Sequence, residues 1–396
     1  MKVLMVTPYV PYPPASGGQI RTYNLLKYLS RKNEITLVAL SKDPADSKYL
    51  PALKKYCHEI YICRKPEKPW QLKSILKAGF SFQPFLIVRN YSQEARETIT
   101  KLLKEKTFDV IHTETFYVMP HVPETTTPIM LVEQTVEFQV YKHFVDSLPF
   151  FLRPPLYLDI AKLRYWESFY WKQASLMATV SEQDRKIVMH EEQSINPIVV
   201  PNGAGEDMII DRLPVKKSDK QTLLFLGNFS WLQNVEAANY LIDNIIPKLK
   251  EEFPKIKLII AGQHAQKIQK TNLAEIIDIP ASDIETVKSL YRDCSLFLAP
   301  IFGPGGTRLK ILAAMSCGLP VISTQTGISG LDVTDHIHVL LANNPEEFVR
   351  AVREALGDKK LYDTLRKNAF DLIHKSYNWE TIAKRLEVAY EDIKKS

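Results

Sequence analysis

A glycine-rich turn followed by two cations is the segment whose residue types are best suited to chemistry. The turn Gly303-Pro304-Gly305-Gly306 follows an apolar run that ends at Ala299-Pro300, and Thr307 opens a predicted amphipathic helix. Backbone amides at a helix start lack internal partners, and the helix dipole favours an anion there. Arg308 and Lys310 add two positive charges within the first turn. The segment therefore predicts a phosphate site, placed before a second strand at 320–324.

A second glycine pair, Gly17-Gly18, precedes the first predicted helix of the chain. Because glycine has no Cβ, the backbone there can come close to a phosphate. The alternative is that both glycine pairs are simple turns. Two such pairs, each after a strand, favour anion sites at the carboxyl ends of strands.

The elements that must position these residues alternate along the chain. Short β-branched runs alternate with helical patterns, which is typical of βαβ units and a parallel sheet. Strands are predicted at 3–7, 35–40, 59–62, 109–112, 129–132, 176–180, 198–200, 223–226, 258–261, 296–298 and 321–323. Helices are predicted at 18–30, 92–105, 181–190 (with Ser181 as N-cap), 234–251 and 379–393.

The alternation is interrupted once, which indicates two domains. Residues 206–221 are polar, charged and contain a proline, and we interpret them as a linker. We expect a Rossmann-like domain at 1–205 and a second Rossmann-like domain at 222–378. A final helix at 379–396 is expected to pack back on the first domain. The predicted fold class is α/β, with two parallel sheets facing across a cleft.

Four segments in this order resemble a known family. They are the N-terminal strand, Gly-Gly loop and helix (KVLMVTPYVPYPPASGGQIRTYNLLKYL), VVPNG at 199–203, LLFLGNFSW at 223–231, and GGTRLKIL with AMSCGLPVIST at 305–324. The pattern resembles the retaining glycosyltransferases of family 4 (group 1), which have the GT-B fold, and within it the GGTRLKIL-type branch. The resemblance covers nearly the whole chain. It implies that the domain at 222–378 binds a nucleoside-diphosphate sugar as donor substrate and that the domain at 1–205 binds the acceptor, with no cofactor and no metal.

The resemblance also shows where this chain departs from the family's donor site. Two glutamates expected eight residues apart correspond to Gly305 and Ala313, and a methyl group cannot bind ribose hydroxyls. The diphosphate clamp of the family corresponds to Gly227-Asn228 and to the neighbourhood of Gln233-Asn234, which carry no charge. Our hypothesis is that Arg308 and Lys310 replace this charge. On an ideal helix the two lie about 200° apart, so both reach one point only if the first turn is irregular.

Three residues of the first domain are candidates for contact with the reacting sugar. Gln134 stands where the family often has a histidine, and an amide can hydrogen-bond a sugar hydroxyl without taking up a proton. Glu133 precedes it at a strand end and either faces the site or is structural. His112 ends another apolar run, with Glu114 two residues on, and either binds sugar hydroxyls or is a capped surface histidine.

Two segments are candidates for contact with the acceptor and the membrane. Residues 68–88 and 150–171 mix cations with many aromatic residues. Such segments can lie on a membrane surface and receive a lipid-linked acceptor. The alternative is that at helical spacing most of these rings belong to the core.

Composition narrows the classes of protein further. The 396 residues have 45% hydrophobic and 24% charged residues and a net charge of +6, which suits a globular protein with an acidic substrate or an anionic surface. No apolar run reaches the roughly 20 residues of a membrane span, and no signal region is expected, so we expect the cytoplasm, with peripheral contact at the inner face of the membrane. The four cysteines lack metal-ligand spacing, and no basic-aromatic pattern indicates nucleic acid.

The resulting hypothesis is a metal-independent, retaining glycosyltransferase of hexosyltransferase type. It would transfer a sugar to a glycan or lipid-linked acceptor in the biosynthesis of surface polysaccharide or glycolipid. The alternative is a weak or inactive GT-B protein that acts as a partner or regulatory subunit, which the neutral residues Ala313, Asn228 and Gln134 favour. A dinucleotide dehydrogenase is disfavoured, because the first loop lacks G-x-G-x-x-G.

Overall fold

The computed structural model describes residues 1–66, 72–205, 208, 210, 212–213, 221–281, 283–304 and 308–395. The chain divides into two compact units, which we treat separately. Unit 1 comprises Met1–Pro201 and Ile382–Ser396, and unit 2 comprises Asn202–Thr381. Residues 202–205, which we assigned to the first domain from the sequence, therefore lie in unit 2.

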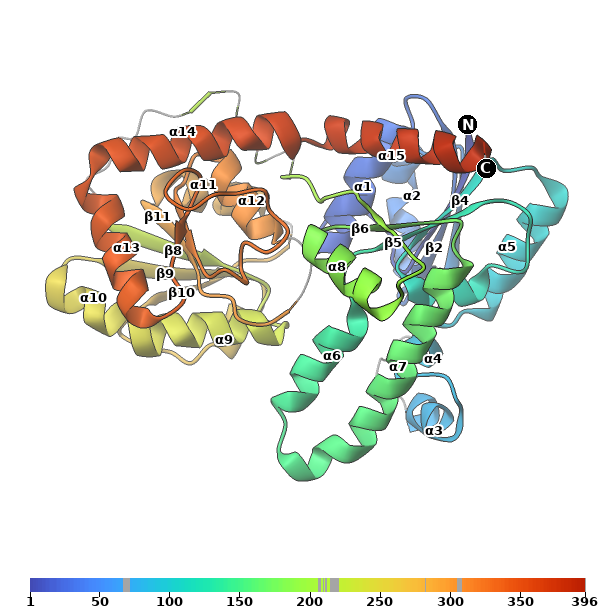
Figure 1. The fold of residues 1–396 in the computed structure, drawn as a ribbon, viewed down its shortest axis with the longest axis horizontal. Coiled ribbons are helices and arrows are strands. Elements are labelled where there is room, and N and C mark those ends of the chain that lie inside the picture. Colours follow the sequence, from blue (N-terminus) through green and yellow to red (C-terminus); the bar gives the residue numbers. More distant parts are fainter. Residues whose placement is uncertain are drawn as a thin grey trace. The chain divides into compact units, whose positions relative to one another are not determined.

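Unit 1 is built on a seven-stranded sheet in which every pair of neighbours is parallel (Figure 1). The strand order is β3-β2-β1-β4-β5-β6-β7. The strands are β1 (Lys2–Thr7), β2 (Glu34–Ser41), β3 (Glu59–Arg64), β4 (Val110–Glu114), β5 (Ile129–Glu133), β6 (Leu176–Thr179) and β7 (Ile198–Val199). The seven strands predicted in the first half of the chain begin and end within two residues of these bounds, and the run at 198–200 forms the short β7.

Helices connect these strands and cover the sheet. They are α1 (Gly17–Leu29), α2 (Leu50–Leu53), α3 (Leu72–Phe80), α4 (Phe85–Asn90), α5 (Gln93–Glu105), α6 (Glu137–Asp146), α7 (Arg153–Gln173), α8 (Glu182–Glu191) and α15 (Trp379–Lys395), whose residues from Ile382 belong to unit 1. Ser181 caps α8 as predicted, because its hydroxyl accepts a hydrogen bond from the Asp184 amide at 3.0 Å.

Unit 2 has a six-stranded parallel sheet in the order β10-β9-β8-β11-β12-β13. Its strands are β8 (Thr222–Leu226), β9 (Lys257–Gly262), β10 (Glu275–Asp278), β11 (Leu296–Ala299), β12 (Val321–Ser323) and β13 (Leu340–Leu341). The sequence analysis missed β10 and β13. Both are short edge strands. The β10 strand begins and ends with exposed acidic residues, and β13 has only two residues, too few to show a strand pattern.

The helices of unit 2 correct one prediction. The helix expected over 234–251 is found, but it is not a regular α-helix throughout: α9 (Leu232–Tyr240), a π-helical segment (Leu241–Ile245) and α10 (Ile246–Glu252) follow one another without interruption. Pro247 explains the irregular turn, because proline lacks the amide hydrogen that a regular α-helix would bond there. The other helices are α11 (Ile284–Asp293), α12 (Leu309–Ser316), α13 (Pro345–Gly357) and α14 (Lys359–Ser376).

Each sheet is the centre of a buried core. The inner strands are apolar on both faces, as expected for parallel strands covered by helices, and β1, β11 and β12 are almost fully buried. In each sheet the chain first adds strands on one side and then crosses to the other. This reversal lies between β1 and β4 in unit 1 and between β8 and β11 in unit 2.

Candidate functional site

The two candidate sites lie where the strand order reverses. In open parallel sheets, ligands bind outside the carboxyl ends of the strands at this point. In unit 2 the segments concerned are 227–231 after β8 and 300–308 after β11. Asn228 and Arg308 belong to these segments, and Lys310 lies in the first turn of α12.

Lys310 is the residue that joins these segments. Its Nζ donates a hydrogen bond to Asn234 Oδ1 at 2.6 Å and lies 4.6 Å from the centroid of the Phe225 ring. A Cβ on Gly227 would come within 3.1 Å of the same Nζ. The ammonium group from α12 therefore reaches Gly227 and Asn234, the segment where the resemblance places a diphosphate clamp and where this chain has no charge of its own.

Arg308 lies beside Lys310 because the first turn of α12 is irregular. The helix begins at Leu309, and Arg308 is its N-cap, with φ −81° and ψ 90°. The 200° separation expected on an ideal helix therefore does not apply. Arg308 Nη2 donates to the Gly303 carbonyl at 2.7 Å. Burial lowers the pKa of Lys310 to about 7, and the positive charge of Arg308 lowers it as well.

The structure does not place the side chains of the other donor-site candidates in the cluster around Lys310. Gly305, Gly306 and Thr307 lie outside the described residues. The Asn228 side chain shapes its own turn, since its Nδ2 donates to Gln263 Oε1 at 3.2 Å and its Oδ1 accepts from the Ser230 amide at 3.0 Å.

Ala313 is also on α12, but it belongs to the core of unit 2. Its side chain is only 9% exposed and packs in the main apolar cluster of this unit. The position where the resemblance implies a ribose-binding glutamate is therefore filled by a methyl group that contributes to packing.

In unit 1, the corresponding edge is organised around the buried carboxylate of Glu114. Its Oε1 accepts from Arg21 Nε at 3.4 Å and pairs with His112 Nε2 at 3.0 Å, and its Oε2 accepts from Gln134 Nε2 at 2.6 Å. Burial raises the pKa of Glu114, but the positive charge of Arg21 and the hydrogen bonds outweigh it, so the net pKa is lowered. Glu114 is thus held as a carboxylate inside the protein.

His112 is fully buried, and both of its ring nitrogens have partners. Since an ionised Glu114 only accepts hydrogen bonds, the Nε2 of His112 carries the proton and donates it. Nδ1 lies 2.6 Å from the hydroxyl of Tyr390, which comes from α15. The structure therefore places His112 between two buried side chains, with no ring nitrogen exposed to a sugar.

Gln134 lies in the same network and contacts the start of α1. Its Nε2 donates to the Tyr9 hydroxyl at 2.7 Å as well as to Glu114. A Cβ on Gly18 would come within 2.4 Å of the Tyr9 hydroxyl and 2.7 Å of Gln134 Oε1, so only glycine fits there. Gly17 is exposed at the first position of α1, behind the Ser16 N-cap. The Gly17-Gly18 pair therefore has a packing role at Gly18 and an accessible backbone at Gly17.

Glu133 is buried on the other side of β5. Its Oε1 accepts from Trp171 Nε1 at 3.0 Å, and its Oε2 has no hydrogen-bond partner. Burial raises its pKa well above the usual range, and the charge of Glu167 adds to the shift. Glu167 in turn accepts from the amides of Glu137 and Phe138 at 2.7 and 2.9 Å, which fixes the start of α6.

A group of three cations lies at the carboxyl ends of β2 and β3. Lys65 Nζ donates to Asn90 Oδ1 at 2.9 Å and to the Pro8 carbonyl, both of which are neutral. Burial lowers the pKa of Lys65 to about 7, and the charges of Lys42 and Arg89 lower it further. This cationic group makes the edge of unit 1 electropositive beside the Glu114 network.

Sequence reasoning missed four residues that organise this edge: Arg21, Lys65, Glu167 and Tyr390. Each acts through a partner distant in sequence, such as Tyr390 and His112, which are 278 positions apart. Glu114 was noted only as a neighbour of His112, and nothing local marked it as the centre of a network.

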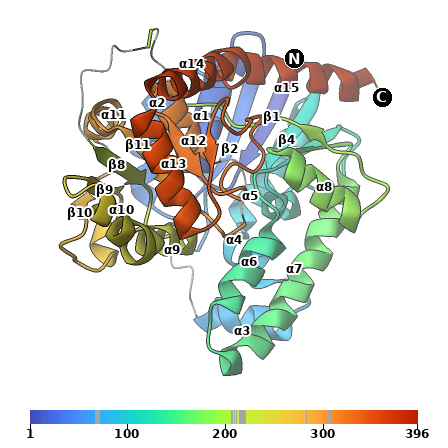
Figure 2. The same ribbon diagram turned by 60° about the vertical axis from the view of Figure 1, so that its left-hand side comes forward.

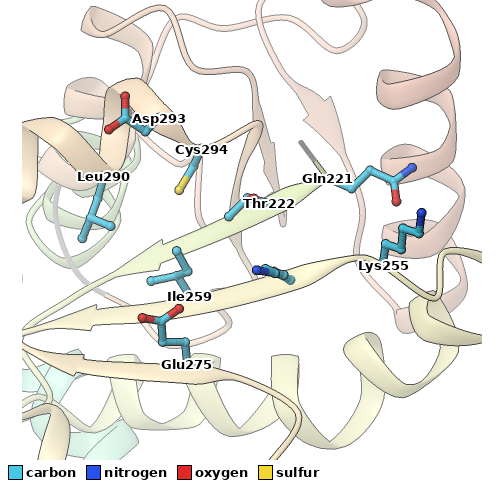
Figure 3. Close-up of a pocket in the computed structure, with 9 residues that line it drawn as sticks. Gln221, Thr222, Lys255, Ile259, Glu275, Leu290, Asp293 and Cys294 are labelled. Atoms are coloured by element: carbon cyan, nitrogen blue, oxygen red, sulfur yellow. The ribbon is translucent and has the colours of Figure 1, made fainter. Parts of the chain in front are cut away.

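A cavity of about 530 Å³ lies at the opposite edge of the unit 2 sheet (Figure 3). It is lined by residues at the amino-terminal ends of strands and by the end of α11, among them Thr222, Lys257, Glu275 and Cys294. None of the predicted site residues lines it. No group of three His, Cys, Asp or Glu side chains suited to a metal ion occurs among the residues that the structure describes.

Comparison with known proteins agrees with this architecture. Residues 220–358 match the family "Glycosyl transferases group 1". A Klebsiella pneumoniae relative, described as an uncharacterized 44.6 kDa protein in the cps region, is 21% identical over 95% of this chain and 96% of its own length.

Two solved structures share the fold over nearly the whole chain. Sucrose-phosphate synthase from Thermosynechococcus elongatus has a TM-score of 0.72 at 16% identity, and covers 99% of both chains. Anabaena HepE, solved in complex with UDP-glucose, has a TM-score of 0.66 at 14% identity, and covers 99% of this chain and 100% of its own.

The fold and the matched segment define the class of protein. The two parallel-sheet units have the GT-B architecture, and a segment of unit 2 matches the group 1 glycosyl transferases. The chain is a glycosyltransferase.

Proposed function

We propose that this glycosyltransferase transfers a hexosyl group, without a metal ion and with retention of configuration, from a nucleoside-diphosphate sugar to a glycan or lipid-linked acceptor. We place the reaction in the cytoplasm, in the assembly of surface polysaccharide or glycolipid. The observation that carries the proposal is the cluster of Lys310, Asn234 and Gly227, with Arg308 beside it, at the strand-order reversal of unit 2.

The electrostatics of this cluster support binding of a diphosphate. Lys310 is largely desolvated, and its only hydrogen bond among the described residues is to a neutral amide. A second cation beside it further disfavours the charged form. An anion bound here would relieve both effects, because charge–charge attraction is strong where water is excluded.

In the proposed reaction, the bond between C1 of the sugar and the diphosphate oxygen breaks, and the acceptor oxygen bonds to C1 on the same face. The proton of the acceptor hydroxyl passes to the leaving phosphate oxygen. Lys310 and Arg308 stabilise the negative charge that develops on that diphosphate. Gln134 and His112 keep the carboxyl edge of the unit 1 sheet ordered through their hydrogen bonds to Glu114.

The acceptor is proposed to carry negative charge near the hydroxyl that reacts. The support is the cationic group of Lys42, Lys65 and Arg89, at the carboxyl edge where a ligand of unit 1 would bind. A phosphate of a lipid-linked acceptor or a carboxylate of an acidic glycan would match these charges.

The experiment that tests the proposal is calorimetric titration with UDP, GDP, ADP and dTDP in the presence of EDTA. We expect micromolar binding of one nucleotide to the native protein and strongly reduced binding to Lys310→Met. Lys257→Met is the matched control, since Lys257 is an exposed lysine at the opposite edge of the same sheet. Equal affinity of the native and Lys310→Met proteins would contradict the assignment.

The second candidate function is a weak or inactive partner subunit. The buried methyl of Ala313 and the non-ionisable Gln134 favour it. If none of the four nucleotides binds, with or without Mg²⁺, this alternative replaces the proposed function.

A further inference from the structure

Exposed apolar side chains are concentrated in one part of unit 1. Of the 17 large hydrophobic residues that are exposed among the described residues, 12 lie between 75 and 82 or between 144 and 169. They are Ile75, Leu76, Phe80, Phe82, Phe144, Phe150, Phe151, Leu152, Tyr157, Leu158, Tyr165 and Phe169. Single exposed hydrophobic residues are normal, but a gathering of this size marks an interaction surface.

These residues lie on a projection that we call the apolar arm, formed by α3 and residues 81–82, α6, the turn 147–152, and α7. Figures 1 and 2 show α6 and α7 as an antiparallel pair that extends away from the sheet of unit 1, with α3 beside its far half. The arm carries the two most exposed of these side chains. Phe80 is 92% exposed and Phe150 is 80% exposed.

The arm is an ordered surface, because α3 is tied to α7 by polar contacts. Lys162 Nζ donates to the carbonyls of Ala78 and Ser81 at 2.9 and 2.8 Å, which closes the carboxyl end of α3. Trp166 Nε1 donates to the Phe82 carbonyl at 2.9 Å. These hydrogen bonds fix α3 against α7, while the apolar side chains of both helices named above remain exposed to solvent.

The charges of the arm favour an anionic partner. Residues 72–82 contain two cations and no acidic residue. The two acids between 144 and 166 are both engaged: Asp146 pairs with Lys142 at 2.7 Å, and Asp159 accepts from the Phe85 amide at 2.9 Å. Lys77 is exposed among the apolar residues of α3.

The aromatic types also distinguish a bilayer from a protein partner. Phe150, Phe151 and Leu152 occupy the turn at the far end, while Tyr165 and Trp166 lie further along α7, where the Phe82 ring contacts both of them. Tyr and Trp prefer the level of the lipid headgroups, and Phe and Leu prefer the acyl region. No helix among the described residues has the length and apolar character to cross a bilayer, so the arm would lie in one face of it.

We propose that the apolar arm docks unit 1 on an anionic lipid bilayer, with Phe80, Phe150 and Phe151 inserted at the boundary of headgroups and acyl chains. Lys77 and Arg153 then lie at the level of the lipid phosphates. This docking goes beyond the proposed sugar transfer and does not depend on it. A second copy of the chain is the competing occupant of the same surface.

The test is flotation of the purified full chain with vesicles of phosphatidylcholine alone and of phosphatidylcholine with 30% phosphatidylglycerol. We expect binding to the anionic vesicles that weakens as salt is added. Replacing Phe80, Phe150 and Phe151 together by serine should lower the vesicle affinity at least tenfold. Lys77→Gln should lower it about fivefold, from the attraction of roughly 1 kcal/mol for one cation near an anionic surface.

The matched control replaces three exposed apolar residues outside the arm, Met189, Ile337 and Val388, by serine. This variant should bind vesicles like the native protein. The proposal is overturned if the native protein does not bind the anionic vesicles, or if the arm variant and the control bind equally well. Nucleotide titration of the arm variant should be unchanged, so this outcome is independent of the donor site.

Sedimentation velocity without lipid tests whether a second copy of the chain, and not a bilayer, covers the arm. We expect the native protein and the arm variant to have the same oligomeric state. A native dimer that the three arm substitutions dissociate would assign the surface to a second copy and overturn the bilayer proposal. If the bilayer covers the arm, adding vesicles should slow hydrogen exchange at residues 75–82 and 144–158. If it does not, exchange there should be unchanged.

Discussion

The carboxyl edges of the two sheets use buried charge in opposite ways. In unit 1, the charge of Glu114 is met by a guanidinium, an imidazole and an amide, all of them inside the protein. In unit 2, the charge of Lys310 meets a neutral amide and the face of the Phe225 ring, with a second cation beside it and no carboxylate among its described contacts. A buried charge with partners of opposite sign inside the protein stabilises the fold. A buried charge without such partners is stabilised by a ligand of opposite sign. The comparison assigns stabilisation of the fold to the Glu114 network of the first edge and anion binding to the Lys310 cluster of the second.

The strongest test of this contrast removes the charge of Glu114. In Glu114→Gln, Arg21 keeps its contacts to the Val200 and Pro201 carbonyls but loses its counter-charge. We expect the free energy of unfolding to fall by about 3–5 kcal/mol, as for other buried pairs that lose one partner. Chemical denaturation measures it, with the exposed Glu391→Gln as control. A loss below about 1 kcal/mol would mean that the network does not brace unit 1.

Removing the charge of Lys310 should weaken ligand binding without lowering the stability of the protein. Lys310→Met should weaken binding of the nucleoside diphosphate by about 1.5–3 kcal/mol, the value of a hydrogen bond to a charged group. Stability should be unchanged or increased, because a desolvated cation is removed. Calorimetry and thermal unfolding of the same samples measure the two effects. A strongly destabilised variant with normal nucleotide binding would reverse the assignment of this edge.

The hydroxyl of Tyr390 offers a smaller test of the first edge. Tyr390→Phe removes the partner of His112 Nδ1 and should lower the free energy of unfolding by about 1–3 kcal/mol, because a buried polar atom is left unpaired. The KM for donor and acceptor should not change. If instead activity falls while stability is retained, His112 acts on a substrate as the sequence hypothesis stated.

The pH dependence of donor binding tests the role of Lys310 at the carboxyl edge of unit 2. The pKa of Lys310 is lowered to about 7 in the free protein, and a bound diphosphate favours its charged form. Binding should therefore take up a proton, and affinity should fall as pH rises above 7, by at most about tenfold per pH unit. Titrations at pH 6 to 9 in buffers of different ionisation enthalpy measure this uptake. Lys310→Met should show a flat profile over the same range.

The sequence predicted the sheets better than it predicted the environment of each charge. Strands such as β1 and β11 are apolar runs whose burial follows from their composition, and the cations Arg308 and Lys310 are visible beside their glycines. The side chains that Lys310 and His112 contact lie 76 and 278 positions away, and only the packed units bring them together. Local pattern could not show that Glu133 and His112 point into the protein, because strand ends expose alternate faces and a helix can cover either one.

The position of Tyr390 has a consequence for how the protein is made. Unit 1 contains Met1–Pro201 and Ile382–Ser396, so 180 residues of unit 2, from Asn202 to Thr381, are synthesised before the helix that carries Tyr390 emerges from the ribosome. At about 5–20 residues per second this delay is on the order of ten to thirty seconds. During that time the imidazole of His112 lacks the hydroxyl of Tyr390, and the hydrogen-bond network inside unit 1 remains incomplete.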